Sequence, residues 1–318
     1  ERRPPKYLED YITCSKDEMT NASVDSCYRA VFGLPQTYRE AIMSPEASRW
    51  EQAMKEEMSS LKENDTFELV TLPKDKNTVG GRWVYALKEN ADTRKMFKAR
   101  YVAKGYKQTE GIDYHETFAP TANLTSVRAL MQIAVQNDFS VHQMDVKTAY
   151  LHAPIDEEIY LDQPEGFEEL SKTGGKLVCK LKKSLYGLKQ SGRNWYKLLN
   201  DHLEQNHFQR NQVDHCVYRK QIGSDTIIVI IWVDDLIIAA SSVDQLNKFK
   251  ETMKSQFNMK DLGQISNFLG IQFEKKEGEI KMSQEKYIAK MLERFGMSEC
   301  KPRATPNELK MECNKNVE

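Results

Sequence analysis

Residues 226–240, which read TIIVIIWVDDLIIAA, decide how this chain folds. Two apolar, β-branched runs, Thr226–Val233 and Leu236–Ala240, are joined directly by the acidic pair Asp234-Asp235. Runs of this length and composition, interrupted by two turn-forming residues, are typical of a buried β-hairpin. The sequence therefore predicts two antiparallel strands with two adjacent carboxylates at their connection.

A third carboxylate gives the acidic pair a chemical meaning. Alone, an Asp-Asp pair is explained well enough as a turn, because aspartate is a good turn residue. Asp145, however, lies near the C-terminal end of another predicted strand, from Ser140 to Val146, which can pair beside the hairpin. Carboxylates are costly to bury next to an apolar sheet unless they are paired or bind metal. Three of them would form an oxygen-ligand site for two divalent cations about 3.5–4 Å apart, an arrangement suited to phosphoryl transfer.

Periodic patterns around the hairpin predict an α+β fold, with helices packed around a mostly antiparallel sheet. The predicted helices begin at the Ser44-Pro45 cap, near Val127, after Gly192, after the Ser242 cap, and at Ser283. The last of them carries an apolar stripe from Tyr287 to Phe295 that we expect to face inward. Two further hairpins are expected over 82–103, turning at 90–92, and over 267–282, turning at 277–278.

Composition excludes several classes of protein. The chain has 318 residues, of which 40% are hydrophobic and 29% charged, enough for one large domain or two small ones. Its net charge of -1 conceals basic segments at 82–107 and 176–197, the second without any Asp or Glu. Such segments suit a polyanionic ligand, and solvated surface charge is the alternative. Scattered cysteines argue against a zinc site, and the apolar runs are too short for a membrane span.

The carboxylate segments resemble the metal-binding motifs of reverse transcriptases. Trp232-Val-Asp234-Asp235 is similar to their central box, and Met144-Asp145-Val-Lys-Thr-Ala149-Tyr150 to their first carboxylate motif. Other segments resemble signatures of copia-type LTR-retrotransposon Pol polyproteins and follow the family order from about Pro35 to Pro306: Lys98-Ala-Arg100-Tyr-Val-Ala-Lys104-Gly105-Tyr106, Gly111-Ile-Asp-Tyr-His-Glu-Thr-Phe118-Ala-Pro120, Ser184-Leu-Tyr186-Gly187-Leu-Lys-Gln190, Phe268-Leu-Gly270-Ile and Ala304-Thr-Pro306.

The resemblance implies a right-hand polymerase, with fingers, palm and thumb around an antiparallel palm sheet. It implies an RNA-directed and DNA-directed DNA polymerase that transfers nucleotides from dNTPs to a primer 3′-hydroxyl by a two-metal mechanism. The expected divisions are a disordered leader over 1–34, fingers and palm over 35–275, and the start of a thumb or connection over 276–318, truncated before RNase H. We accordingly expect no RNase H activity from these residues.

The resemblance also assigns the metal and primer sites. Asp145 and Asp234 would be the principal ligands of two Mg²⁺ ions, with Mn²⁺ as an alternative, and Asp235 would assist them. Phe268-Leu269-Gly270 resembles the primer-grip hairpin. The implied partners are an RNA or DNA template with its primer, and dNTPs. Integrase and RNase H neighbours, found in such polyproteins, are absent from this sequence, and no membrane partner is expected.

The nucleotide site is assigned in the same way. Tyr150 occupies the place of the aromatic gate that excludes a ribose 2′-hydroxyl, although a buried palm aromatic would explain it equally well. Gln190 matches the residue that contacts the incoming nucleotide, and Lys98 and Arg100 are candidates for the triphosphate. Trp232, where the family usually has Tyr, is a departure that bears on rate and fidelity.

Two other functions remain open on the sequence. One is a catalytically silent retroelement remnant that binds nucleic acid without copying it. The other is an unrelated metal-dependent phosphotransferase, which would explain the carboxylates but not the ordered motifs. The sequence leaves the oligomeric state open, and the family's setting, a cytoplasmic virus-like particle, is an expectation from analogy.

Overall fold

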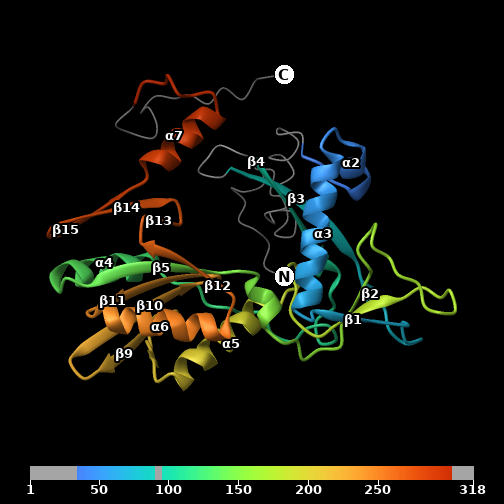
Figure 1. Ribbon diagram of the computed structural model, residues 1–318, viewed down its shortest axis with the longest axis horizontal. Coiled ribbons are helices and arrows are strands. Elements are labelled where there is room, and N and C mark those ends of the chain that lie inside the picture. The colour runs from blue at the N-terminus through green and yellow to red at the C-terminus, as the bar shows by residue number, and fades with distance from the viewer. Residues whose placement is uncertain (1–33, 90–94, 303–318) are drawn as a thin grey trace, which may run out of the picture.

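The structure is a computed structural model that describes residues 34–89 and 95–302 (Figure 1). The helices are α2 Tyr38–Met43, α3 Ala47–Glu63, η2 Gly105–Lys107, α4 Leu124–Gln136, η3 Ala149–His152, α5 Ser191–Gln205, α6 Val243–Gln256 and α7 Glu285–Arg294. The strands are β1 Phe67–Val70, β2 Thr78–Val79, β3 Gly81–Glu89, β4 Lys95–Ala103, β5 Ser140–Val146, β6 Tyr160–Leu161, β7 Val178–Leu181, β8 Gln209–Arg210, β9 Val217–Ile222, β10 Asp225–Trp232, β11 Asp235–Ala240, β12 Met259–Gln264, β13 Asn267–Phe268, β14 Ile271–Lys276 and β15 Glu279–Ser283.

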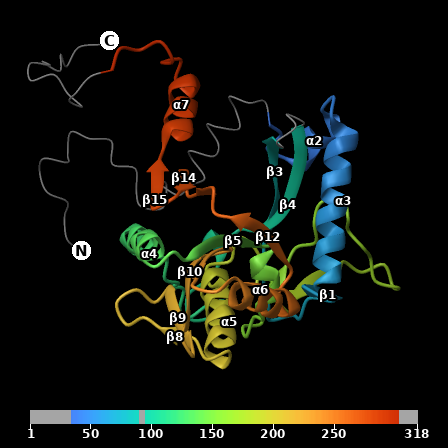
Figure 2. The same cartoon turned by 60° about the vertical axis from the view of Figure 1, so that its left-hand side comes forward.

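A six-stranded sheet, in the order β12-β5-β11-β10-β9-β8, is the centre of the molecule, and its paired strands are all antiparallel. The predicted hairpin forms β10 and β11, and β11 pairs with the predicted Asp145 strand, β5. Figures 1 and 2 place α4 on one side of this central sheet and α5 and α6 on the other. The expected α+β class with an antiparallel sheet is therefore confirmed.

The buried residues form two separate cores. The first lies around the central sheet and includes the completely buried Val229, Leu236 and Ile238. The second joins α3 to the β3–β4 hairpin and to β7, with Trp50 packed edge-to-face on Tyr85 at a centroid distance of 5.2 Å. Apolar area removed from water stabilises both cores, at about 25 cal/mol per Å². The carboxylate hairpin thus belongs to the first core, and the β3–β4 hairpin with its basic residues to the second.

The C-terminal part of the described chain is a small three-stranded sheet, β13-β14-β15, followed by α7. The hairpin expected over 267–282 is confirmed as β14–β15. The inward-facing stripe expected on the last helix is wrong for the described part of the chain, because α7 has no buried residue and Tyr287 and Phe295 are exposed. An amphipathic pattern fixes which side of a helix is apolar, whereas burial also needs an element packed opposite it.

Two predicted caps had different outcomes. The Ser242 hydroxyl accepts a hydrogen bond from the Gln245 amide at the start of α6, as its spacing predicted. Ser44 does not cap α3, because that helix begins only at Ala47. Instead, Ser44 ends α2, and its hydroxyl donates to the Ala41 carbonyl. The leader expected over 1–34, apart from its last residue, and the turn expected at 90–92 lie outside the described residues.

The helices that the structure describes include none that is both long and apolar enough to cross a bilayer.

Candidate active site

The three predicted carboxylates lie at one end of neighbouring strands. Asp235 is the Cα register partner of Asp145 across the β11–β5 pair. The backbone of Asp234 is tied to the same strand, since the Val146 amide donates a 2.8 Å hydrogen bond to the Asp234 carbonyl. Residues directly opposite each other in an antiparallel pair point to the same face of the sheet. Strand pairing therefore brings Asp145, Asp234 and Asp235 to one place.

The connection between β10 and β11 is held in a strained conformation. Val233 has a φ of 55°, in the left-handed region that a β-branched residue rarely adopts. Its carbonyl accepts a 2.6 Å hydrogen bond from the indole nitrogen of Trp195, on α5 behind the sheet. Trp195 is itself buried and packs edge-to-face on Phe257. The aspartates that follow Val233 are thus placed by a fixed turn.

The electrostatics of the site disfavour the charged form of Asp235. Burial raises the pKa of Asp235 above its ordinary value, and the nearby Asp234 and Asp145 raise it further. The 3.0 Å hydrogen bond from the Gln143 amide acts in the opposite direction, because it stabilises the charged carboxylate. A group with this environment binds a proton or a cation readily. The acids therefore have the charge and the donor chemistry for a hard divalent ion.

The backbones of the three aspartates lie close together, but their side chains do not form a complete metal site. Across residues 34–89 and 95–302, no three His, Cys, Asp or Glu side chains stand in an arrangement that could hold a metal ion. The strand register nevertheless fixes the backbone positions of the three aspartates, and aspartate side chains have only two rotatable bonds. The oxygen donors fit a Mg²⁺ or Mn²⁺ ion by their type and charge.

Tyr150 lies beside the carboxylates. It is in η3, which follows β5 after the left-handed Thr148. The half-buried phenol is close enough to Asp234 and Arg100 to interact with both: burial raises its pKa, Asp234 raises it further, and Arg100 lowers it. The ring centroid of Tyr150 is 4.8 Å from that of Tyr186. Tyr150 is therefore within electrostatic reach of both a candidate metal ligand and a candidate phosphate ligand.

The two predicted phosphate ligands share one face of β4, because Ala99 and Tyr101, which alternate with them, are buried on the other. The Arg100 guanidinium carbon lies 4.3 Å from the centroid of the Tyr186 ring. Burial raises the pKa of Glu57 on α3, and Arg100 and Lys98 act against that rise. Arg100 therefore connects β4 to Tyr186, whose ring also contacts Tyr150, and Lys98 is two residues away on the same strand.

Gln190 is buried among protein partners, and its contact with the incoming nucleotide stays a prediction. Its side chain is only 1% exposed and makes hydrogen bonds inside the protein. The amide nitrogen donates to the Asp113 carbonyl at 2.8 Å and to the Glu157 carboxylate at 3.2 Å, and the amide oxygen accepts from Gln108 at 3.0 Å. A direct contact with a nucleotide would require the amide to leave these partners. Sequence reasoning missed Gln108, which carries no motif signal of its own.

The primer-grip segment belongs to the small C-terminal sheet. Phe268 is buried, whereas Leu269 and Gly270 form an exposed turn with φ values of 51° and 76°. This turn leads on from β12, the strand that pairs with β5 on the side away from β11. In that pair Lys260 is the register partner of Asp145. The segment is thus connected to the carboxylate strand through one intervening strand.

Many cations of the basic segment 176–197 already have acidic partners. Lys180 and Lys182 make ion pairs with Glu158 and Asp65, at 3.5 Å and 3.1 Å. Arg193 pairs with Glu116 at 2.5 Å. Exposed pairs of this kind contribute about 0–1 kcal/mol and exchange readily for other anions. The segment is therefore closer to balanced in charge than its sequence suggests.

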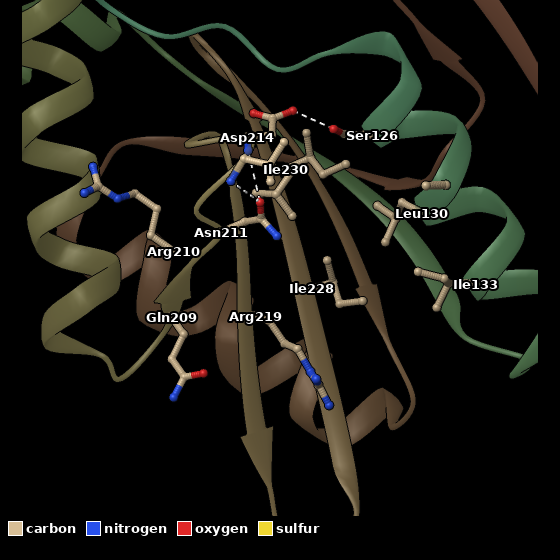
Figure 3. A pocket seen from close by; sticks show the side chains of 13 residues that line it. Ser126, Leu130, Ile133, Gln209, Arg210, Asn211, Asp214, Arg219, Ile228 and Ile230 are labelled. Atoms are coloured by element: carbon tan, nitrogen blue, oxygen red, sulfur yellow. Dashed lines mark hydrogen bonds between the residues drawn. The ribbon is translucent and has the colours of Figure 1, made fainter.

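A pocket of about 430 Å³ lies on the face of the central sheet that carries the aspartates, between α4 and strands β9 and β10 (Figure 3). Its apolar wall includes Leu130, Ile228 and Ile230. Ile230 alternates with Trp232, the register partner of Asp235, so both side chains are on the carboxylate face. None of the three aspartates lines this pocket. It is a neighbour of the candidate site and not a part of it.

Comparison with known families gives one extensive match. Residues 64–309 match the family described as reverse transcriptase (RNA-dependent DNA polymerase).

Relatives of known name are transposon polyproteins. The chain is 41% identical over 276 residues to the retrovirus-related Pol polyprotein from transposon TNT 1-94 of Nicotiana tabacum, covering 86% of the chain and 21% of that protein. It is 36% identical over 270 residues to the Pol polyprotein from transposon RE1 of Arabidopsis thaliana, covering 84% of the chain and 18% of that protein. The chain thus spans about a fifth of the length of these relatives. The expected resemblance to copia-type Pol polyproteins is confirmed.

Among solved structures, the foamy viral protease-reverse transcriptase in complex with double-stranded DNA matches 74% of this chain and 36% of that one. The TM-score is 0.40 and the sequence identity 12%, a likeness too distant to carry an argument about the site.

Proposed function

We propose, because this chain belongs to the reverse transcriptase (RNA-dependent DNA polymerase) family, that it copies an RNA or DNA template by adding deoxynucleotides to a primer 3′-hydroxyl. The observation that carries the proposal is the register of Asp235 on Asp145, with the Asp234 backbone tied to the same strand. It brings the backbones of the three aspartates to the same end of the central sheet, and carboxylates in such positions suit metal-assisted phosphoryl transfer.

Asp145 and Asp234 are the proposed principal ligands of two Mg²⁺ ions, and Asp235 supports them. Bound there, the ions would lower the pKa of the primer hydroxyl and stabilise the charge on the departing pyrophosphate. The raised pKa of Asp235 supports this assignment, because a bound cation offsets both causes of the rise, burial first and then the neighbouring acids. The role of the chain itself is to hold these oxygen donors in place on β5 and at the Val233 turn.

The residues around the carboxylates are proposed to hold the nucleotide. Arg100, with Lys98 on the same face of β4, would neutralise the triphosphate. Tyr150 would meet the sugar and exclude a 2′-hydroxyl. Gln190 is proposed to act indirectly, since its hydrogen bonds hold the segments of Asp113 and Glu157 next to the site. Phe268-Leu269-Gly270 would position the primer terminus.

The proposed macromolecular partner is a primer paired with its template. Such a duplex is held mainly through its backbone phosphates, so its affinity should fall as the salt concentration rises, because releasing counterions into a more concentrated solution gains less free energy. Binding measured by fluorescence anisotropy should therefore weaken steeply between 50 and 200 mM salt, about tenfold or more. An affinity independent of salt would contradict a phosphate-based contact.

Primer extension tests the proposal. The substrate is poly(rA) annealed to oligo(dT), supplied with dTTP and Mg²⁺. We expect extension that depends on both the template and the metal. Binding of the hybrid without any extension would favour the silent remnant over the polymerase.

A further inference from the structure

The Tyr186 hydroxyl is an anomaly at the candidate site. Within the part of the chain that the structure describes, the buried side-chain polar atoms without a hydrogen-bond partner are the hydroxyls of Thr66 and Tyr186. Nearly all buried polar groups in folded proteins are paired, since an unpaired one costs about 1–3 kcal/mol. Exceptions therefore call for a functional explanation, such as a partner that arrives with a ligand.

The surroundings of Tyr186 are the groups already assigned to nucleotide binding. Its ring contacts the Arg100 guanidinium on β4, at 4.3 Å from the centroid, and the Tyr150 ring, at 4.8 Å between centroids. Burial raises the pKa of the Tyr186 phenol to about 12; Arg100 lowers it, and Asp234 raises it further. The phenol is therefore protonated at neutral pH and can donate a hydrogen bond.

The backbone of Tyr186 is fixed before any ligand binds. Its carbonyl accepts a 2.8 Å hydrogen bond from the Ala103 amide at the end of β4. Gly187, at a φ of 95°, follows it, and a Cβ there would collide with the Ala103 carbonyl. A Cβ on Gly105 would in turn collide with the Gly187 carbonyl. Two glycines thus allow the β4 end and the Tyr186 turn to lie in direct backbone contact.

We propose that Tyr186 determines specificity at the nucleotide site by hydrogen-bonding the sugar 3′-hydroxyl of the incoming deoxynucleoside triphosphate. The inference rests on the proposed function. A nucleotide whose triphosphate lies on Arg100 and whose sugar lies against Tyr150 places its sugar next to Tyr186, which contacts both residues. A deoxyribose ring carries a single free hydroxyl, at the 3′ carbon. A site built to bond a substrate hydroxyl discriminates against the analogue that lacks it.

Single-nucleotide insertion on poly(rA)/oligo(dT) tests this assignment. The full chain and its Tyr186→Phe variant are compared with dTTP and with 2′,3′-dideoxythymidine triphosphate. The variant should lose about threefold to tenfold in kcat/KM for dTTP, the range expected for one hydrogen bond, and nothing for the dideoxy analogue. Its preference for dTTP over the analogue should fall by the same factor. An equal loss with both nucleotides, or no loss with either, would overturn the assignment.

A matched control is Tyr85→Phe, which removes a buried hydroxyl that contacts the Met54 sulfur at 3.3 Å in the second core. It should leave the preference between the two nucleotides unchanged. Thermal unfolding gives an independent check, since removing an unpaired hydroxyl should keep or raise the unfolding temperature of the Tyr186→Phe variant. A clearly lower unfolding temperature would show that the hydroxyl has a partner within the protein, against the inference.

Nucleotide binding separates this inference from the proposed function. A primer ending in a dideoxynucleotide allows the complex with template, Mg²⁺ and nucleotide to form without reaction. If the wild type inserts no nucleotide but binds dTTP more tightly than the dideoxy analogue, and the Tyr186→Phe variant does not, the polymerase assignment fails and the Tyr186 assignment stands. If the wild type binds both equally, the Tyr186 assignment fails whatever the enzyme inserts.

Discussion

The indole nitrogen of Trp195 lies 2.6 Å from the carbonyl oxygen of Val233 and donates a hydrogen bond to it. Val233 is the left-handed residue that directly precedes Asp234. One side chain of α5 thus stabilises the unusual backbone on which the position of the acidic pair depends. The hydrogen bond connects the first core, where Trp195 is buried, to the carboxylate end of the sheet.

Replacing Trp195 by Phe should affect both stability and catalysis. The Val233 carbonyl would lose its donor, which should cost about 1–3 kcal/mol of unfolding free energy. Because the turn would also be free to relax, kcat for dTTP insertion should fall by a larger factor than the factor by which KM changes. Trp83→Phe is the control, since the Trp83 indole likewise donates to a carbonyl, that of Glu165, at 3.0 Å. Similar losses of kcat in both variants, measured below their unfolding temperatures, would contradict a specific role of the Val233 turn in catalysis.

The contact between β4 and the Tyr186 turn predicts a strong glycine requirement at 187. In Gly187→Ala the left-handed backbone is penalised by about 1–2 kcal/mol, and the new methyl also meets the Ala103 carbonyl. Gly223→Ala has the same kind of backbone, with a φ of 59°, but open space around it. Chemical denaturation should therefore show a larger loss for Gly187→Ala. Equal losses would mean that the close approach contributes nothing.

Lys250 on α6 holds Asp261 and His142 together behind the carboxylate strand, and these three residues form a buried clamp. Its ammonium group, on a side chain 5% exposed, lies 3.0 Å from both Asp261 oxygens and 2.7 Å from Nδ1 of His142. Lys250→Met should destabilise the protein by about 1–3 kcal/mol, since the carboxylate and the imidazole lose their donor. Lys254→Met, on the same helix, breaks the exposed pair with Glu251 and removes a weaker charge interaction with Asp261, so it should cost at most about 1 kcal/mol. Urea denaturation of the two variants measures the difference, and similar losses would count against the clamp.

The same clamp predicts a dependence of stability on pH. The pKa of His142 is lowered from 6.5, first by burial and then by Lys250, with Asp261 opposing them. As pH falls below 6.5 the unfolded chain takes up the proton before the folded one, so the stability that depends on neutral His142 is lost progressively towards its lower folded pKa. His142→Gln should therefore flatten the decline in urea midpoint between about pH 6.5 and 5. A decline as steep as that of the wild type would contradict this account.

The sequence predicted the central hairpin because its long β-branched runs leave little choice of structure. Lys98 and Arg100 share a face for an equally general reason, since side-chain alternation in a strand has a fixed period. The Val233–Trp195 bond was not predictable, because it joins residues far apart in sequence and depends on how α5 packs.

Gln190 and Tyr186 have different packing partners, which their shared motif did not predict. Both lie in the same resembling motif, and the sequence singled out Gln190 as the nucleotide contact. The structure buries the Gln190 amide among Gln108, Asp113 and Glu157, whereas Tyr186 contacts Arg100 and Tyr150. Packing partners of this kind depend on backbone geometry, such as the positive φ of Gly187, which a motif does not display.

The most direct test of the central claim is single-turnover insertion of dTTP by Asp234→Asn, with Asp225→Asn as its control. Asp225 begins β10, the strand whose other end leads into Asp234, so its change alters the charge of the strand but not the carboxylate site. We expect the Asp234→Asn variant to bind poly(rA)/oligo(dT) but to lose insertion by a factor of about 1,000 or more, since a principal metal ligand is removed. The Asp225→Asn variant should keep the wild-type rate. Insertion by Asp234→Asn at the wild-type rate would contradict the account.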